Sequence, residues 1–177
     1  MLFATSQQVL SASAFVACVI PTADGAQGVI IAQGGWFGGW SLYLTDGRPA
    51  YCYNLFGIQR FKIQGDTAIS AGEHQVRAEF DYDGGGLARG GTLTLYVDGQ
   101  PVGEGRIERT QPMIFSSDDK TDIGVDHGTP VSDDYGIGES SFTGQINWVQ
   151  IDLGDDAQDA DHLITGEERW QIAMARQ

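Results

Sequence analysis

Short runs of alternating apolar and polar residues fill most of the chain, and turn residues separate one run from the next. Alternation with a period of two is typical of half-buried strands, because successive side chains of a strand point to opposite faces of a sheet. Glycine, aspartate and proline interrupt the runs roughly every 8–12 residues, as in two-sheet sandwiches. The pattern predicts about ten strands, over Ser11–Ile20, Gln27–Gln33, Ser41–Thr45, Pro49–Leu55, Ile58–Gln64, Glu73–Tyr82, Thr92–Asp98, Pro101–Glu108, Thr121–Val125 and Phe142–Leu153.

The hairpin that begins near residue 73 carries the strongest of these signals. Glu73–Tyr82 and Thr92–Asp98 alternate on either side of a glycine-rich turn, and Asp98-Gly99 then predicts a tight turn into the next strand. We therefore expect an all-β fold, a two-sheet antiparallel jelly-roll sandwich of the concanavalin A or laminin G type. Gln27–Gln33 is continuously apolar, which predicts a strand buried on both faces.

The end of the chain departs from the strand pattern. Thr165 and Glu168 have the spacing of a capping box, which predicts a short helix over residues 165–176. No linker or internal repeat divides the chain, and 177 residues with 41% hydrophobic content suffice for one well-filled core. We therefore expect a single domain over residues 1–177, with the terminal helix docked on the sandwich; the alternative is that it docks on a partner chain.

The net charge is −14, and the acidic excess is concentrated in residues 116–177. A chain of this charge repels nucleic acids and anionic membranes, so neither is an expected partner. No apolar run approaches the roughly 20 residues of a membrane-spanning helix. No secretory signal is recognised at the start, and the cytoplasm is the expected compartment. Cys18 and Cys52 lie in apolar, strand-like segments, which favours two buried free thiols over one disulfide.

Several blocks of the sequence resemble the C-terminal region of a group of bacterial arylsulfatases. These blocks are Gly28–Gly35, Phe37–Tyr43, Tyr53–Gly57, Phe80–Gly86, Gly91–Gly99, Pro112–Ser116, Phe142–Gly144, Trp148–Asp152 and Glu167–Gln177. They are spread along a match that runs from about Ser11 to Gln177, nearly the whole chain. The resemblance implies a concanavalin A-like or laminin G-like accessory domain, with a sulfatase core or a second copy of the chain as a possible partner.

The catalytic machinery of those enzymes has no counterpart here. Their nucleophile lies in a Cys/Ser-x-Pro-Ser-Arg motif, and neither Cys18 nor Cys52 is followed by that sequence. His74, His127 and His162 are scattered along the chain and suggest no catalytic set. The resemblance therefore implies an accessory module without the enzyme, and we expect a non-catalytic chain that requires no cofactor.

A glycine–aromatic segment, Gly34–Trp40, is the first candidate for binding. Aromatic rings stack on the apolar faces of sugars, and glycines let a ligand approach the backbone. Trp36 is expected to be exposed, and Trp40, which precedes an alternating strand, to be buried. The alternative is that these rings belong to the core or pack on a neighbouring domain. The candidate ligand-binding residues are Trp36, Phe37, Trp40, Tyr51, Tyr53, Asn54, Phe56 and Arg60.

Six aspartates after Ser116 form the second candidate. Carboxylate oxygens are the ligands that calcium prefers, although the spacing here does not match an EF-hand loop. The alternative is a set of acidic loops that are simply solvated. The candidate calcium ligands are Asp118, Asp119, Asp122, Asp126, Asp133 and Asp134.

Glu79, Asp81 and Asp83 form the third candidate, because alternate positions share one face of a strand. Jelly-roll glycoside hydrolases use a similar pattern of carboxylates, but neighbours at this spacing lie about 7 Å apart, and retaining enzymes need about 5–5.5 Å. Three hypotheses follow: a module that binds a glycan or a protein surface, a structural domain that packs on a sulfatase core or self-associates, and a glycoside hydrolase.

Overall fold

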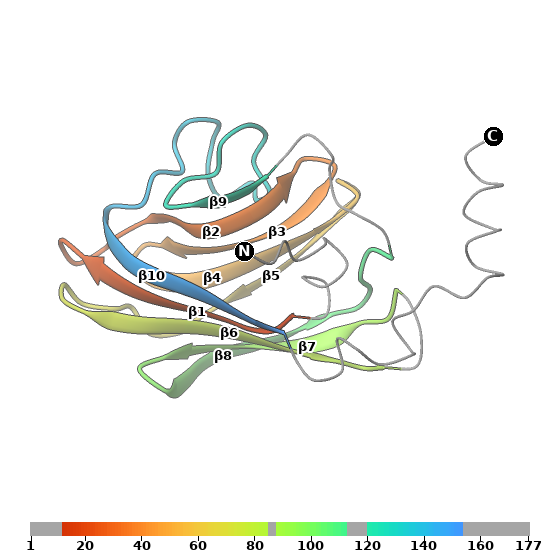
Figure 1. Cartoon of the computed structure of the whole chain (residues 1–177), viewed down its shortest axis with the longest axis horizontal. Helices are drawn as coiled ribbons and strands as arrows, with labels where there is room; N and C mark the ends of the chain where they lie inside the picture. Colours follow the sequence, from red (N-terminus) through yellow and green to blue (C-terminus); the bar gives the residue numbers. More distant parts are fainter. Residues whose placement is uncertain (1–11, 85–87, 113–119, 154–177) are drawn as a thin grey trace, which may run out of the picture.

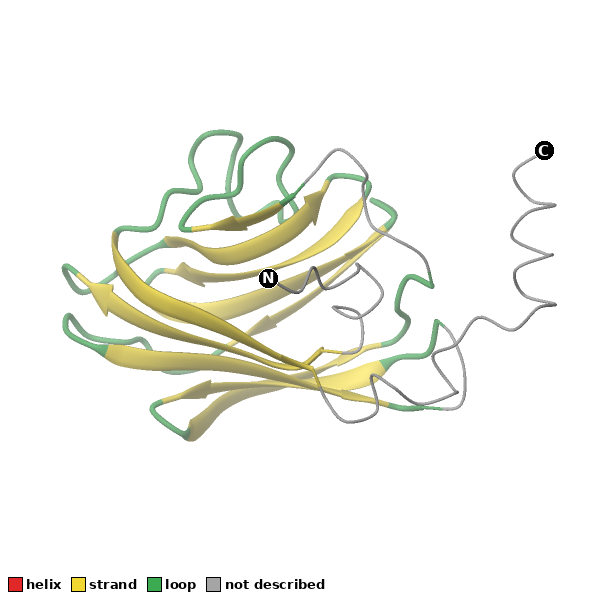
Figure 2. Cartoon of the chain, in the orientation of Figure 1, coloured by secondary structure: helices red, strands yellow, loops and turns green. Residues whose placement is uncertain are grey.

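The computed structural model describes residues 12–84, 88–112 and 120–153, and these form two antiparallel sheets joined by loops (Figures 1 and 2). The predicted helix over residues 165–176 lies outside the described residues. In the part of the chain that is described, no helix has the length and apolar character needed to cross a membrane.

The first sheet, sheet A, has the strand order β10-β1-β6-β7-β8. Its strands are β10 (Gly144–Leu153), β1 (Ala12–Pro21), β6 (His74–Tyr82), β7 (Gly91–Val97) and β8 (Gln100–Ile107). The terminal strands β1 and β10 pair with each other, from Ala12 opposite Leu153 to Pro21 opposite Gly144. This pairing brings the two ends of the described chain into one sheet.

The second sheet, sheet B, has the order β5-β4-β3-β2-β9. Its strands are β5 (Gln59–Gln64), β4 (Arg48–Leu55), β3 (Gly38–Thr45), β2 (Gly28–Gly35) and the short β9 (Thr121–Ile123). The two-sheet antiparallel sandwich predicted from the sequence is therefore confirmed, and each predicted strand is present to within a few residues.

The loop within the glycine–aromatic segment is shorter than the sequence indicates. Only Trp36 and Phe37 form the turn, because β2 continues to Gly35 and β3 resumes at Gly38. The two strands approach so closely that a Cβ on Gly34 would lie 2.2 Å from the carbonyl oxygen of Gly38. Gly34 also has a φ of 86°, which side-chain-bearing residues rarely adopt. Glycine thus makes a tight hairpin out of the predicted loop.

The main core lies between the sheets and is built around three aromatic rings. The Phe15 ring lies 4.2 Å from that of Trp40, and the Trp40 and Tyr51 rings are stacked with their centroids 6.3 Å apart. Aliphatic side chains of both sheets, among them Val19, Leu42 and Leu95, surround these rings and are fully buried. Burial of such side chains stabilises the fold by roughly 1.5–3 kcal/mol each.

A second apolar cluster lies on the outer face of sheet B. Val131 and Tyr135, from the loop between β9 and β10, cover Tyr43 and Cys52 there. The central strands β2, β3 and β4 of sheet B are consequently buried on both faces, which confirms the prediction for β2, whereas the edge strand β5 keeps exposed positions. Among the described residues no comparable apolar cluster covers the outer face of sheet A, and β6 alternates between buried and more exposed positions.

Both cysteines are free and buried, as the sequence predicts. Cys18 lies on β1 of sheet A and Cys52 on β4 of sheet B. Burial raises the pKa of the Cys52 thiol to about 12, so this group is protonated and unreactive at neutral pH.

Candidate functional site

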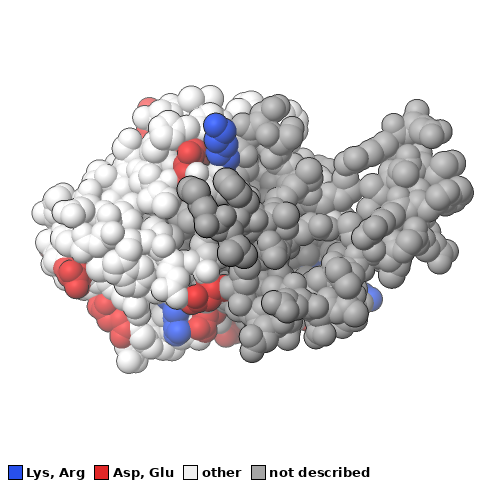
Figure 3. All heavy atoms as spheres, in the orientation of Figure 1, with Lys and Arg blue, Asp and Glu red and all other residues white. Residues whose placement is uncertain are grey.

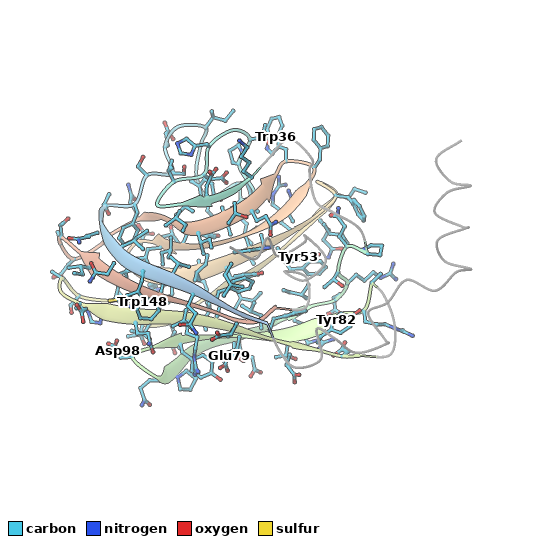
Figure 4. All side chains as sticks on the ribbon, in the orientation of Figure 1. Trp36, Tyr53, Glu79, Tyr82, Asp98 and Trp148 are labelled. Carbon is cyan, nitrogen blue, oxygen red and sulfur yellow. The ribbon has the colours of Figure 1, made fainter. Side chains whose placement is uncertain are left out.

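Four large apolar side chains are exposed on two neighbouring turns at one end of sheet B. Trp36 and Phe37 occupy the β2–β3 turn and are 52% and 75% exposed. Phe56 and Ile58 occupy the β4–β5 turn and are 45% and 86% exposed. We call these four residues the aromatic rim. Figure 4 shows Trp36 at the edge of the molecule, well away from Tyr53, which lies between the sheets.

Asn54 holds the two turns of the aromatic rim together. Its buried amide nitrogen donates to the carbonyl oxygens of Gly35, at 2.8 Å, and Trp36, at 3.1 Å. Its amide oxygen accepts from the backbone N–H of Gly57 at 2.9 Å. A third loop adds a further tie, since the Trp36 amide donates to Thr129 Oγ1 at 2.9 Å. The rim is therefore presented on a backbone that these four hydrogen bonds, three of them through the buried Asn54 side chain, hold in place.

Three of the predicted platform rings are in the core and form no exposed surface. Trp40, Tyr51 and Tyr53 are buried between the sheets, and the Tyr53 hydroxyl accepts from the Gln111 amide at 2.7 Å. The expected burial of Trp40 is confirmed, and Tyr51 and Tyr53 also belong to the core, which was the alternative to a ligand surface, because the alternation of β3 and β4 turns these rings inward. Burial of the Tyr53 hydroxyl also raises its pKa.

Two polar members of the predicted platform have structural partners instead. Asn54 is buried beneath the rim, and the Arg60 Nε donates to the carbonyl oxygen of Val131 at 3.0 Å. Arg60 thus helps to hold the loop that covers sheet B. Of the eight predicted residues, only Trp36, Phe37 and Phe56 belong to the aromatic rim. Ile58, its fourth member, was not singled out from the sequence.

The acidic loop is organised by its own carboxylates. Buried Asp126 accepts from the Val131 amide at 3.1 Å and from the Tyr135 hydroxyl at 2.8 Å. Asp133 and Asp134 both pair with Lys62 on β5, each at 2.5 Å. Asp122 accepts from the His127 amide at 2.9 Å. These contacts fasten the loop to the outer face of sheet B.

No three histidine, cysteine or acidic side chains converge as metal ligands among the described residues. Asp122, Asp126, Asp133 and Asp134 therefore do not form the predicted calcium set between themselves. Asp118 and Asp119 lie outside the described residues, and a calcium site that includes either of them stays a prediction.

A polar pocket of about 380 Å³ lies where this loop meets sheet B, at the opposite end of β2 and β3 from the rim. The rings of Tyr43 and Tyr135 meet edge to face at 5.4 Å beside it. The Tyr43 hydroxyl donates to the Asp134 carboxylate, and burial together with this bond raises the pKa of Tyr43. The side chains that line the pocket include Gln27, Tyr43, Thr45, Asp134, Tyr135 and Glu139.

Two of the three carboxylates in and just after β6, Glu79 and Asp83, are paired with arginines. Glu79 forms an ion pair with Arg77 at 2.7 Å, and Arg106 binds Asp83 through two hydrogen bonds of 2.9 and 2.6 Å. The Arg106 guanidinium holds the pKa of Asp83 below its usual range. A glycosidase acid needs a raised pKa, so these contacts do not favour a glycoside hydrolase.

One histidine is less isolated than the sequence indicates. The His74 ring contacts Asp98 through Nδ1 at 2.8 Å and Ser70 through Nε2 at 3.2 Å. The three residues come from different segments, and only the Ser70-x-x-x-His74 spacing and the Asp98-Gly99 turn are visible in the sequence. Neither signal indicates that the side chains meet.

No protein-family model matches this chain, and no curated protein matches it. Several solved structures, in contrast, are similar to it. The CBM40 of the Ruminococcus gnavus IT-sialidase, bound to α2,3-sialyllactose, has a TM-score of 0.57 at 16% identity and covers 83% of this chain and 78% of its own. The Limulus polyphemus SAP-like pentraxin has a TM-score of 0.52 at 16% identity, covering 89% and 72%.

Domains LG4–5 of the mouse laminin α1 chain have a TM-score of 0.50 at 19% identity, covering 79% of this chain and 35% of theirs. Likeness at such low identities shows the fold alone, and the resemblance to arylsulfatases stays a prediction. Together, the sheet topology and these structures show that the chain has a concanavalin A-like or laminin G-like jelly-roll β-sandwich fold.

Proposed function

We propose that this chain is a binding module that holds a glycan against the aromatic rim. The observation that carries the proposal is the exposure of Trp36, Phe37 and Phe56 on two turns tied together by buried Asn54. Exposed aromatic rings grouped in one place mark interaction surfaces. Rings on a rigid backbone also lose little entropy on binding.

The charge of the chain restricts the class of glycan. A net charge of −14 disfavours sialylated or sulfated chains at a site without a cation. In Figure 3 the acidic side chains lie in several separate places over the visible face. We therefore expect a neutral glycan, even though a solved structure of this fold carries sialyllactose.

A glycan array compares the wild-type chain with Trp36→Ala. Loss of retention with an unchanged melting temperature is expected, because the Trp36 side chain contributes to the surface and not to the core. The matched control is Trp148→Ala on β10, since that tryptophan is 44% exposed and lies on the other sheet. Equal retention by wild type and Trp36→Ala contradicts the assignment of the rim.

The polar pocket gives a second control. Glu139→Gln alters that pocket at the opposite end of sheet B and leaves the rim unchanged. If retention on the array depends on Glu139 but not on Trp36, the glycan site is assigned to the pocket and not to the rim.

A protein surface is the second candidate partner, and Ile58 is the observation that favours it. Its side chain is the most exposed of the rim and is aliphatic, so it offers a sugar no aromatic face. A neighbouring domain, such as a sulfatase core, or a second copy would bury it. Light scattering of wild type and Ile58→Ser tests self-association. A wild-type monomer that gains no mass with a sulfatase core added in trans contradicts this candidate.

A further inference from the structure

Ser70, His74 and Asp98 form a chain of hydrogen bonds far from the aromatic rim. Ser70 lies in the segment between β5 and β6, His74 begins β6, and Asp98 lies in the β7–β8 turn. The Ser70 Oγ lies 3.2 Å from His74 Nε2, and His74 Nδ1 lies 2.8 Å from Asp98 Oδ2. A hydroxyl, an imidazole and a carboxylate connected in this order form the usual arrangement of an activated nucleophile.

Asp98 is oriented for its part in this arrangement. Its Oδ1 accepts from the Gln75 amide at 2.8 Å, which leaves Oδ2 for the imidazole. Although partial burial opposes the effect, the Gln75 amide and the His74 ring hold the pKa of Asp98 below its ordinary value. Because an ionised carboxylate only accepts hydrogen bonds, Asp98 Oδ2 accepts from Nδ1–H of the imidazole. In the neutral tautomer that this bond selects, Nε2 carries no proton and accepts from the Ser70 hydroxyl.

The segment that carries Ser70 is anchored on both sides of the serine. The Ile69 amide donates to the carbonyl oxygen of Gly47 at 2.8 Å, and the Ile69 side chain is buried. The Ala71 amide donates to Asp24 Oδ1 at 3.0 Å. Ser70 itself is exposed, and a Cβ built on Gly72 meets no atom within 4 Å. The hydroxyl is thus held in place and open to solvent.

We propose that Ser70, His74 and Asp98 hydrolyse small activated esters, with Ser70 as nucleophile, His74 as general base and Asp98 as a positioning residue. This activity goes beyond the binding function and does not depend on it. The carboxylates of Asp24 and Asp98 border the serine, so the substrate class is uncharged or cationic esters. An exposed site of this kind suits short acyl groups with good leaving groups.

The proposed reaction has two balanced steps. In the first, Ser70 Oγ bonds to the acyl carbon, its proton passes to His74 Nε2, and the ester C–O bond breaks as the leaving oxygen takes that proton. In the second, a water oxygen attacks the acyl carbon and His74 takes a water proton. The acid then departs as Ser70 Oγ regains the proton. The sum is ester plus water to acid plus alcohol.

The test measures p-nitrophenyl acetate hydrolysis by the full chain and its variants. Ser70→Ala and His74→Gln are expected to lower kcat/KM by at least about tenfold. The matched controls are Thr67→Ala, a hydroxyl in the same segment bound to Asp66, and His127→Gln, an imidazole beside Asp122. Both controls are expected to keep the wild-type rate. A wild-type rate equal to that of Ser70→Ala overturns the proposal, because imidazole alone then explains the hydrolysis.

Two further measurements separate catalysis from folding. A fluorophosphonate probe is expected to label Ser70 in the wild type, with the modified peptide identified by mass, and to label His74→Gln much less. Asp98→Asn is expected to lower kcat with little change in KM or melting temperature, because asparagine also tolerates the φ of 48° at this turn. Labelling at other sites only, or an unchanged kcat in Asp98→Asn, contradicts the assignment.

Discussion

Trp36 and Trp40 are four residues apart, and the structure gives them opposite environments. Trp40 lies in the core between Phe15 and Tyr51, whereas Trp36 is half exposed on the β2–β3 turn. The same residue type supplies packing energy in one place and a surface in the other. The comparison shows that, around this hairpin, the position of a ring relative to the turn decides whether it belongs to the core or to a candidate site.

Trp40→Ala tests the core side of this comparison and has the largest expected effect. Removal of a fully buried indole leaves a cavity between the two sheets, so the free energy of unfolding should fall by about 3–5 kcal/mol. Chemical denaturation followed by circular dichroism measures the change. A loss below about 1 kcal/mol contradicts the placement of Trp40 in a well-packed core.

Asn54→Ala tests the tie between core and rim. It removes the donor to Gly35 and Trp36 and the acceptor of the Gly57 amide, so the free energy of unfolding should fall by about 1–3 kcal/mol. Glycan retention should weaken as well, because the two turns lose their common anchor. Full stability with full retention shows that the rim does not need this anchor.

Lys62→Ala tests the polar fastening of the loop on the outer face of sheet B. The Lys62 ammonium holds the pKa of Asp133 below its usual range. The stability from this pair is therefore present above the unfolded-state pKa of about 3.9 and is lost as the pH falls through the lower folded-state value. Asp133 is mostly exposed, so the contribution at neutral pH should be only about 0–1 kcal/mol.

Thermal unfolding from pH 7 to pH 2, with and without Lys62, measures this contribution. The difference between the two proteins should shrink toward low pH. A difference that grows as the pH falls contradicts the assigned sign.

Trp36→Ala tests the surface side of the comparison and has the smallest expected effect on stability. The free energy of unfolding should change by less than about 0.5 kcal/mol, because the side chain is already half in water. Chemical denaturation of Trp36→Ala and Trp40→Ala under the same conditions compares the two positions directly. A loss for Trp36→Ala that approaches that of Trp40→Ala shows that the rim is part of the core.

The strands could be predicted well because alternation is a local property. The ends of β6 and β7 lie within one residue of their predicted bounds, and the continuous apolar run of β2 indicated burial on both faces. The loop that covers sheet B was not predicted. Its acidic residues suggested solvent or calcium, whereas Val131 and Asp126 turn inward once the loop folds over the sheet.

The candidate sites were predicted only in part, because they depend on contacts between segments that are distant in the sequence. Trp36 and Phe37 were found from the glycine–aromatic segment, but Ile58 joins them only because the β4–β5 turn lies beside the β2–β3 turn. Asn54 was expected to bind a ligand, and instead its amide connects the two turns. Ser70, His74 and Asp98 are brought together by three segments whose packing no local pattern records.

The sequence by itself determined an acidic, all-β chain with strands of known extent, buried cysteines and an exposed tryptophan at a glycine-rich turn. These properties depend on residue type and on neighbours within a few positions. Only the tertiary structure decided that Tyr51 and Tyr53 lie in the core, what covers sheet B and which side chains meet His74. Those outcomes depend on how strands pair and how loops cross the sheets, because contacts between distant segments arise from packing and not from spacing along the chain.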